Sequence, residues 1–349
     1  MFPDADFPAV PYPGARPDRS YVHDAGHGHP LSVAPDALSG WRVGAVDLDA
    51  WLAERGCAPL AERTPLLSYG SNANPSKLTW LRAAHGLSGP VVVLRARTVG
   101  LSAVWAAGRR VVDDQRPAVL AAAPGVVEDH AVVMAAEDQV VAFDKCEGRG
   151  DRYQLARVSA GVVTTEDGGS WDAVLAYVGA REIRRPLLVR GGPVACTAVS
   201  QADAVHLVGE PAPDDGLSAP PLAGPPDPRD FPRSLFVYGT LQPGASAWAL
   251  MAPHAAGPAR PAALGGSLYD TGQGYPALLL GDGPGVNGWV VPLRSGAALA
   301  ALDEYEGPEY TRVRVVLADG TVVWAYVWVR PVDGMRRLSE PWPSYDSIG

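Results

Sequence analysis

The chain has 349 residues, of which 47% are hydrophobic and 19% charged, and its formal net charge is −9. This length is sufficient for two domains with separate cores, and the hydrophobic content excludes disorder along the whole chain. The negative charge disfavours nucleic acid as a partner, because nucleic-acid binding requires a basic surface. No apolar run approaches the roughly 18 residues that span a membrane, and the first residues lack a secretory signal pattern. The three cysteines are too scattered for disulfides or a zinc cluster, so we expect a cytoplasmic protein.

The first 60 residues predict an N-terminal arm with one short helix. Residues 1–30 are rich in Pro, Asp, Gly and His without helical or strand periodicity. Residues 47–55 favour a helix, because Leu48, Trp51 and Leu52 fall on one face.

Two later segments of the chain resemble each other. Each begins with a short apolar run that ends in Tyr-Gly followed by Ser or Thr, at residues 65–71 and 234–240. Each continues to an acidic motif that ends in Glu-Gly, at residues 143–148 and 302–307. Hairpin patterns around an Asp-Gly turn then follow in both. The simplest account is a tandem pair of α+β domains.

A proline-rich stretch separates the two similar segments. Residues 210–233 contain too many prolines for a helix or a central strand. We therefore predict a first domain at 61–209, a linker at 210–233 and a second domain at 234–349.

The motifs can be placed on local structure. Asn74 and Pro75 favour the start of a helix that Gly86 ends. The apolar face of this helix would carry Leu78, Leu81 and Ala84. In the second domain Ser295 is expected to cap a helix over 297–303, which places Glu306 just beyond its end.

This arrangement suggests a chemistry. A glycine after a strand allows close approach to the backbone, and successive free N–H groups can bind a carboxylate or a developing oxyanion. A carboxylate at the end of an apolar helix has a raised pKa and can serve as a general base near neutral pH. Together they suit proton abstraction from an amine followed by attack on a carbonyl.

The second domain resembles the γ-glutamylcyclotransferase-like superfamily, in its AIG2-like branch. The resemblance rests on the ordered motifs at 236–241, 274–278, 287–291 and 302–307, followed by Tyr310-Thr311-Arg312. The first domain resembles the same superfamily more loosely, at 69–72, 116–120 and 143–148.

The resemblance implies a fold and a reaction. Each domain would be a small mixed β-barrel with flanking helices. The enzyme, of lyase or acyltransferase type, would cyclise a γ-glutamyl group to 5-oxoproline and release an amine or amino acid, with Glu306 as general acid and base. Glu147 would hold the same place in the first domain. The substrate-binding residues would be Tyr238, Gly239, Thr240, Leu241, Tyr69, Gly70, Ser71, Asn72 and Tyr310. The reaction needs no metal or organic cofactor, and the partner is a small γ-glutamyl molecule.

The first domain departs from the pattern at two places. His130 stands where the second domain has Gly288, and a bulky side chain there could narrow the pocket. Leu155 stands where the second domain has Arg312. The resemblance also implies that Tyr177 and Trp328 face the ligand.

Two other functions stay open. The protein could be a non-catalytic ligand-binding or scaffold protein that keeps the pocket. It could also be an amidase or acyltransferase that uses the same glutamate to activate an external water or amine. The leaving group, the pathway and the oligomeric state are not fixed by the sequence.

Overall fold

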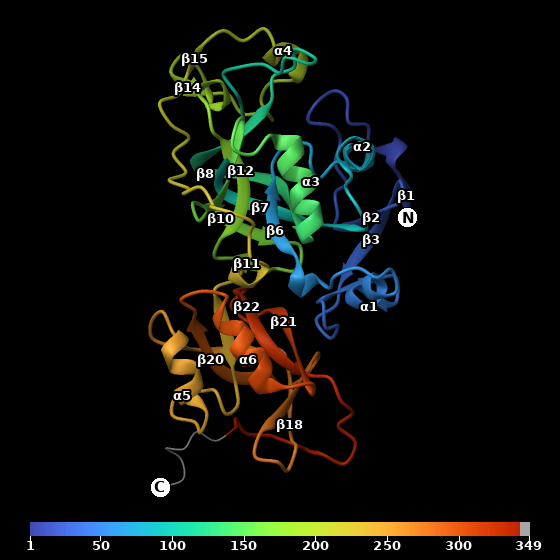
Figure 1. Ribbon diagram of the computed structural model, residues 1–349, viewed down its shortest axis with the longest axis vertical. Helices are drawn as coiled ribbons and strands as arrows, with labels where there is room; N and C mark the ends of the chain where they lie inside the picture. Colours follow the sequence, from blue (N-terminus) through green and yellow to red (C-terminus); the bar gives the residue numbers. More distant parts are fainter. Residues whose placement is uncertain (343–349) are drawn as a thin grey trace. The chain divides into compact units, whose positions relative to one another are not determined.

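The computed structural model describes residues 1–342, and Figure 1 shows the course of the chain. The chain folds as two units, and each is built from segments that are separated in the sequence. Unit 1 contains residues 1–31, 63–166 and 173–226, and unit 2 contains residues 32–62, 167–172 and the chain from Asp227 onward. Both units combine sheets with a few helices, which confirms the α+β class.

Unit 1 contains a sheet in which the strands follow the order β2–β7–β8–β6–β12–β9. Strand β6 pairs antiparallel with β8 and parallel with β12. Helix α3 lies across the sheet near β6 and β12, and α2 packs beside α3 (Figure 1). The elements are β1 (Phe2–Pro3), β2 (Tyr21–Asp24), β3 (His27–Val33), β6 (Thr64–Ser68), α2 (Pro75–His85), β7 (Val91–Trp105), β8 (Ala118–Ala135), α3 (Glu137–Glu147), β9 (Tyr153–Val158), β10 (Val162–Thr165), β12 (Val174–Gly179), β13 (Leu187–Val189), β14 (Gly192–Pro193), α4 (Gln201–Ala204) and β15 (Glu210–Pro211).

Unit 2 contains a sheet with the order β17–β20–β16–β22–β21. Alternate residues of β16 pack on opposite faces, with Leu235 and Val237 beside residues of the helices α5 and α6, and Phe236 in a second core cluster. The elements are β4 (Trp41–Val43), β5 (Val46–Asp47), α1 (Leu48–Ala53), β11 (Ser170–Trp171), β16 (Ser234–Val237), α5 (Trp248–Met251), β17 (Arg260–Leu264), β18 (Gly266–Asp270), β19 (Pro276–Leu280), β20 (Val286–Pro292), α6 (Ala298–Glu306), β21 (Tyr310–Val316), β22 (Val322–Trp328) and β23 (Arg336–Arg337).

Five strands of each sheet have matching order and direction. In unit 1 they are β7–β8–β6–β12–β9, and in unit 2 they are β17–β20–β16–β22–β21. The third and fourth strands are parallel in both, and all other neighbours are antiparallel. A helix, α3 or α6, precedes the fifth strand in both. The register aligns Leu66 with Leu235, because each is paired with the fourth strand at the corresponding place.

The N-terminal segment forms strands where the sequence predicts an extended arm. Strand β2 pairs with β3 on one side and with β7 on the other. The side chains of residues 20–23 are all buried, so the strand has no hydrophobic alternation that its sequence could show. The short helix predicted near residue 48 is confirmed as α1, with Leu48, Trp51 and Leu52 buried.

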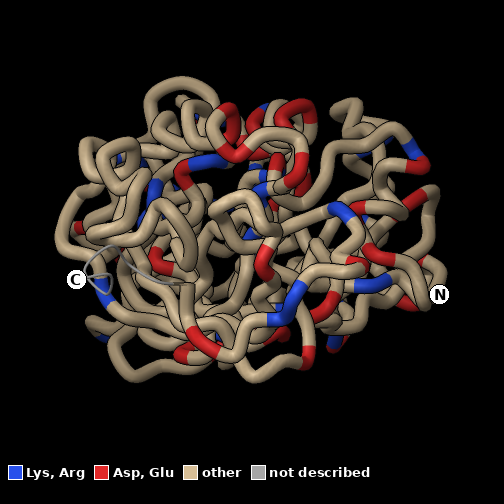
Figure 2. The backbone as a smooth tube through the Cα atoms, turned by 90° about the horizontal axis from the view of Figure 1, so that it is seen from below, with Lys and Arg blue, Asp and Glu red and all other residues tan. Residues whose placement is uncertain are grey.

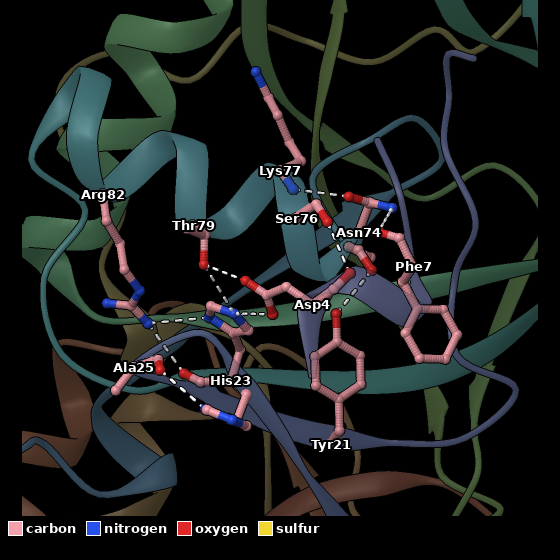
Figure 3. Close-up of polar contacts among 12 residues, drawn as sticks. Asp4, Phe7, Tyr21, His23, Ala25, Asn74, Ser76, Lys77, Thr79 and Arg82 are labelled. Atoms are coloured by element: carbon pink, nitrogen blue, oxygen red, sulfur yellow. Dashed lines mark hydrogen bonds and ion pairs between the residues drawn. The ribbon is translucent and has the colours of Figure 1, made fainter. Parts of the chain in front are cut away.

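Polar contacts hold this segment against α2 in unit 1 (Figure 3). His23 is fully buried, and its Nε2 lies 3.0 Å from an Asp4 carboxylate oxygen while Arg82 donates to its Nδ1 at 3.2 Å. The Asn74 amide donates to three backbone carbonyl oxygens between residues 7 and 15. Through these contacts the residues that precede β2 pack as part of unit 1.

The helix predicted after Asn74 is confirmed as α2. The Asn74 carboxamide oxygen accepts from the Lys77 N–H at 2.7 Å, and Gly86 ends the helix with a φ of 71°. Leu78 and Leu81 are buried as predicted, whereas Ala84 is exposed.

The helix that carries Glu306 differs from the prediction. Helix α6 begins at Ala298 after Ala297, whose side chain makes no capping bond, so the predicted Ser295 cap is wrong. The helix extends through Glu306 and ends at Gly307, because Gly307 adopts a φ of 70°. Glu306 is therefore the last helical residue.

The predicted hairpins differ between the units. In unit 2, β21 and β22 form the predicted hairpin. In unit 1 the corresponding pair is β9 and β12, and the chain between them makes β10, which pairs with β7. The predicted linker also has structure, because its residues 220 and 222 bond to the backbone of β9.

Charged residues of both signs are interspersed along the chain (Figure 2). None of the helices within residues 1–342 has the length and apolar character needed to cross a membrane.

Candidate active site

Unit 2 contains a cavity of about 310 Å³ that brings together the residues predicted for the second domain. Tyr238, Gly239, Thr240, Leu241, Glu306 and Tyr310 all line it. The loop at 239–241 follows β16 directly, and the N–H groups of these three residues donate to no acceptor within residues 1–342. Glu306 comes from the end of α6. The cavity thus contains both the carboxylate and the backbone donors that the sequence predicts.

The Glu306 carboxylate is partly buried, and burial raises its pKa to about 7. No side chain within residues 1–342 donates a hydrogen bond to it. A carboxylate with this pKa is present in both protonation states near neutral pH, as a group that accepts and returns a proton requires.

Hydrogen bonds connect the Tyr-Gly motif to α6 through β22. The Tyr238 hydroxyl donates to the Tyr326 carbonyl oxygen at 2.8 Å, and the Tyr326 hydroxyl donates to the Asp303 carboxylate at 2.8 Å. Asp303 also accepts from Arg312 at 2.8 Å and 3.1 Å. Because Asp303 lies one turn before Glu306 on α6, this network fixes the helix end relative to the loop.

Unit 1 contains a cavity of about 560 Å³ that holds the residues predicted for the first domain. Tyr69, Gly70, Ser71, Asn72 and Glu147 all line it. The N–H groups of residues 70–72 donate to no acceptor in the described part of the chain. The cavity also receives Tyr12 from the N-terminal segment. A β-carbon at position 70 would lie 2.9 Å from the Tyr12 hydroxyl, which explains the glycine there.

Glu147 has a different environment from Glu306. The Asn72 side-chain amide donates to its carboxylate at 2.8 Å, whereas the corresponding residue in unit 2 is Leu241. Burial raises the pKa of Glu147, while the Asn72 hydrogen bond and the charge of Lys77 act in the lowering direction.

The network behind the carboxylate is repeated in unit 1. The Tyr69 hydroxyl donates to the Tyr177 carbonyl oxygen, and the Tyr177 hydroxyl donates to Asp144 at 2.8 Å. Leu155 replaces Arg312 as expected, but Arg149 from the loop after α3 supplies the guanidinium at 3.0 Å from Asp144. The missing arginine of the motif is therefore replaced from another position.

The His130 substitution does not narrow the pocket. The strand registers align His130 with Gly288, as predicted, because Ser68 pairs with Ala131 and Val237 with Trp289. His130 is buried beside Glu128 at 3.2 Å and is not part of the cavity lining. A β-carbon at Gly288 would lie 2.7 Å from the Phe236 ring, and unit 1 has the smaller Leu67 at that position.

Several lining residues are not predicted by the sequence. In unit 2, Tyr326 lines the cavity and Trp328 does not, whereas in unit 1 Tyr177 lines the cavity. The further lining residues include Tyr275, Tyr305, Glu309, Tyr12, Lys77, Arg110 and Arg184. The aspartate three residues before each glutamate is repeated in the sequence and could have indicated the network. No sequence signal indicates that Tyr12 belongs to the site, because it is far from the other site residues in sequence.

No group of three or more His, Cys, Asp or Glu side chains suited to a metal ion occurs within residues 1–342. The three cysteines are free, and Cys146 lines the unit 1 cavity, where burial raises the pKa of its thiol. A raised pKa keeps the thiol protonated, which disfavours a nucleophilic role.

Comparisons with known proteins agree with the resemblance. A family model described as gamma-glutamyl cyclotransferase, AIG2-like, matches residues 235–344. The chain is 36% identical over 134 residues to the gamma-L-glutamyl-butirosin B gamma-glutamyl cyclotransferase of Niallia circulans, and the match covers 36% of this chain and 82% of that protein.

Solved structures are similar over parts of the chain. A protein specific to uropathogenic E. coli has 25% identity and a TM-score of 0.27, over 33% of this chain and 95% of that one. YkqA from Bacillus subtilis has 15% identity and a TM-score of 0.24, over 77% of this chain and 84% of that one. The sequence relative and the matched family model together show that the chain belongs to the AIG2-like gamma-glutamyl cyclotransferase family.

Proposed function

We propose that unit 2 cyclises the γ-glutamyl group of a γ-glutamyl amine to 5-oxoproline and releases the free amine. The observation that carries the proposal is the lining of one cavity by a carboxylate with a pKa of about 7 and by three residues whose backbone N–H groups donate to no acceptor within residues 1–342. The relative from Niallia circulans, which is named as a gamma-glutamyl cyclotransferase, supports it.

In the proposed reaction Glu306 carries two protons in turn from the attacking nitrogen to the leaving nitrogen. Its carboxylate takes a proton from the α-ammonium group of the glutamyl unit, and the freed nitrogen attacks the γ-carbonyl carbon. The carbonyl oxygen becomes an oxyanion that accepts hydrogen bonds from the N–H groups at 239–241. Glu306 then returns this proton to the leaving nitrogen as the original amide bond breaks. Its carboxylate next takes the second proton from the new ring nitrogen, which leaves the neutral lactam, and this proton passes to the released amine, which departs as an ammonium ion. One C–N bond forms and one breaks, and no water is consumed.

The ring closure is intramolecular, so the entropic cost of bringing the reacting groups together is largely met within the substrate. The base, the acid and the oxyanion donors are all groups of this chain. We therefore propose that the reaction needs no organic cofactor.

The charge of the unit 2 cavity favours a basic leaving group. Its charged lining residues are Glu306 and Glu309, and no Lys or Arg within residues 1–342 lines it. Tyr275, Tyr305 and Tyr310 add aromatic surface. Carboxylates and aromatic faces attract ammonium groups, so we propose that the released product is an amine that carries a further positive charge.

We also propose that unit 1 is a second copy of the same fold and that the two form a tandem repeat of small barrels. The shared strand order, the repeated Tyr-Asp network and the Glu147 position support this. In unit 2, the bond from Ala318 N–H to Ala263 O joins the tip of the β21–β22 hairpin to the edge strand β17, as barrel closure requires.

Product identification tests the function. The full chain would be incubated with γ-glutamylputrescine, and the products separated by chromatography. We expect 5-oxoproline and putrescine in equal amounts. Free glutamate in place of 5-oxoproline would indicate an amidase, and binding without any product would indicate a ligand-binding protein. Either result would contradict the proposed function.

A further inference from the structure

The cavity of unit 1 differs from that of unit 2 in its charge. Six Lys and Arg residues line it, against the single carboxylate of Glu147. They are Lys77, Arg109, Arg110, Lys145, Arg152 and Arg184. The unit 2 cavity has two carboxylates and, within residues 1–342, no Lys or Arg in its lining. The two cavities therefore favour ligands of opposite charge.

Some of these cations already have acidic partners. Arg109 pairs with Asp114 at 2.7 Å, and the Arg110 Nε donates to Asp113 at 3.0 Å. The other four, including Lys77 and Arg184, form no ion pair with a carboxylate within residues 1–342. Their charge is available to a ligand.

Lys77 is positioned by its neighbours. It lies on the first turn of α2, whose N-cap is Asn74, and its Nζ lies 3.5 Å from the centre of the Trp80 ring. Both Lys77 and Trp80 line the cavity. Contact with the ring limits the freedom of the ammonium group, which reduces the entropic cost of binding an anion there.

Arg184 supplies a second indication. It is 5% exposed and lies over the Tyr153 ring, and its Nε forms no hydrogen bond in the described part of the chain. The Asn72 carboxamide oxygen is likewise buried and without a donor there. Buried polar atoms are normally paired, so unpaired ones in a cavity lining indicate that a polar ligand completes them.

We propose that the unit 1 cavity is a second binding site, selective for γ-glutamyl compounds whose leaving group bears a carboxylate or phosphate. The N–H groups at 70–72 would hold the glutamyl unit, as the corresponding loop does in unit 2, and Lys77 and Arg184 would hold the anion of the leaving group. This inference rests on the proposed function in one respect. It takes the ligand of unit 1, like that of unit 2, to contain a γ-glutamyl group.

The test compares two probes on the full chain by isothermal titration calorimetry. γ-Glutamylglutamate carries an anionic leaving group and γ-glutamylputrescine a cationic one. The Glu306→Gln variant is used so that turnover in unit 2 does not interfere. We expect γ-glutamylglutamate to bind, and Lys77→Gln to weaken its binding about tenfold or more, since a charge-assisted hydrogen bond is lost. Arg19→Gln, which removes an exposed arginine of unit 1 outside the cavity, is the matched control and leaves binding unchanged.

Two further measurements test the proposal without the Lys77→Gln variant, which could fold poorly. Raising KCl from 50 to 500 mM weakens the binding of γ-glutamylglutamate when unit 1 carries no substitution, because salt screens the attraction. Free glutamate and inorganic phosphate bind much more weakly than γ-glutamylglutamate, because each lacks part of the ligand. Equal binding of these simple anions, or equal affinity in the lysine variant and its control, would overturn the proposal. Absence of γ-glutamylputrescine turnover by the unsubstituted chain would instead contradict the proposed function of unit 2.

Discussion

Units 1 and 2 place a glutamate in the same position of the same strand order and surround it differently. Glu147 accepts a hydrogen bond from Asn72 and shares its cavity with six Lys and Arg residues. Glu306 has Leu241 at the corresponding loop position and shares its cavity with Glu309. The Tyr-Asp network behind the two glutamates is the same. The shared strand order fixes where the carboxylate lies, whereas the loop and the cavity wall give each carboxylate a different electrostatic environment.

The largest effect should come from removing the carboxylate of unit 2. Glu306→Gln should lower kcat on γ-glutamylputrescine by roughly 10²–10⁴-fold, the usual contribution of a general acid or base. Glu147→Gln should leave this activity in place. Activity would be measured as 5-oxoproline formed per minute.

Glu304→Gln is the matched control for this prediction. Glu304 is exposed on α6, two residues before Glu306, and does not line the cavity. Equal activities of the Glu306→Gln and Glu304→Gln proteins would remove Glu306 from the reaction.

The second prediction concerns Gly288, which aligns with His130 of unit 1. Gly288→His should lower the free energy of unfolding by about 1–3 kcal/mol, because a β-carbon there would lie 2.5 Å from the Val237 carbonyl oxygen and 2.7 Å from the Phe236 ring. Adding Phe236→Leu, which copies the pair Leu67 and His130 of unit 1, should recover part of the loss. Urea unfolding measures both. If the loss of unfolding free energy in the double variant equals the sum of the losses in the two single variants, the two positions are not coupled.

The third prediction is the pH dependence of unit 2. Glu306 must be ionised to act as the base, and its pKa is about 7. The value of kcat/KM should therefore rise with pH and level off above 7, with roughly a tenfold loss for each pH unit well below 7. A profile that is flat from pH 5 to 8 would contradict the assignment.

Leu241→Asn sharpens this prediction by copying the loop of unit 1. The new amide would donate to the ionised Glu306, and such a bond favours the charged form. The acidic limb of the profile should then move to lower pH. An unmoved limb, with the variant folded and active, would show that an amide at this loop position does not lower the pKa of the glutamate.

The smallest effects should come from the shared network. Tyr326→Phe in unit 2 and Tyr177→Phe in unit 1 each remove one hydrogen bond to an aspartate, which should cost about 1 kcal/mol of stability. The costs should be similar, because both aspartates keep an arginine partner. Urea unfolding of the two variants would reveal any large difference, which would mean that Arg149 does not replace Arg312.

The sequence predicts which residues line the two cavities better than it predicts the strands around them. Gly70, Glu147, Gly239 and Glu306 are recognisable from motifs, because glycine after a strand and a glutamate at a helix end are local features. Tyr12 is not, because only tertiary packing brings it to Gly70. The role of Arg149 could not be predicted either. The motif places an arginine at the position of Leu155, whereas the guanidinium that contacts Asp144 comes from Arg149.

The strand β2 shows a different limit of sequence reasoning. A strand that is buried on both faces shows no alternation of hydrophobic and polar residues, and a short strand has too few residues to stand out by length. The sequence of residues 20–23 therefore predicts an arm and not a strand. The sequence predicts that β9 and β12 pair, but it does not predict that β10, which lies between them in the chain, pairs with β7.

The position of β2 has a practical consequence for work with unit 1 alone. A fragment starting at residue 61 would uncover the edge of β7 and leave its backbone N–H and C=O groups without partners. Such an open edge invites strand addition by other molecules and aggregation. A soluble fragment of this half would therefore have to keep the first 31 residues, either at its start or joined by a designed connection to Arg63.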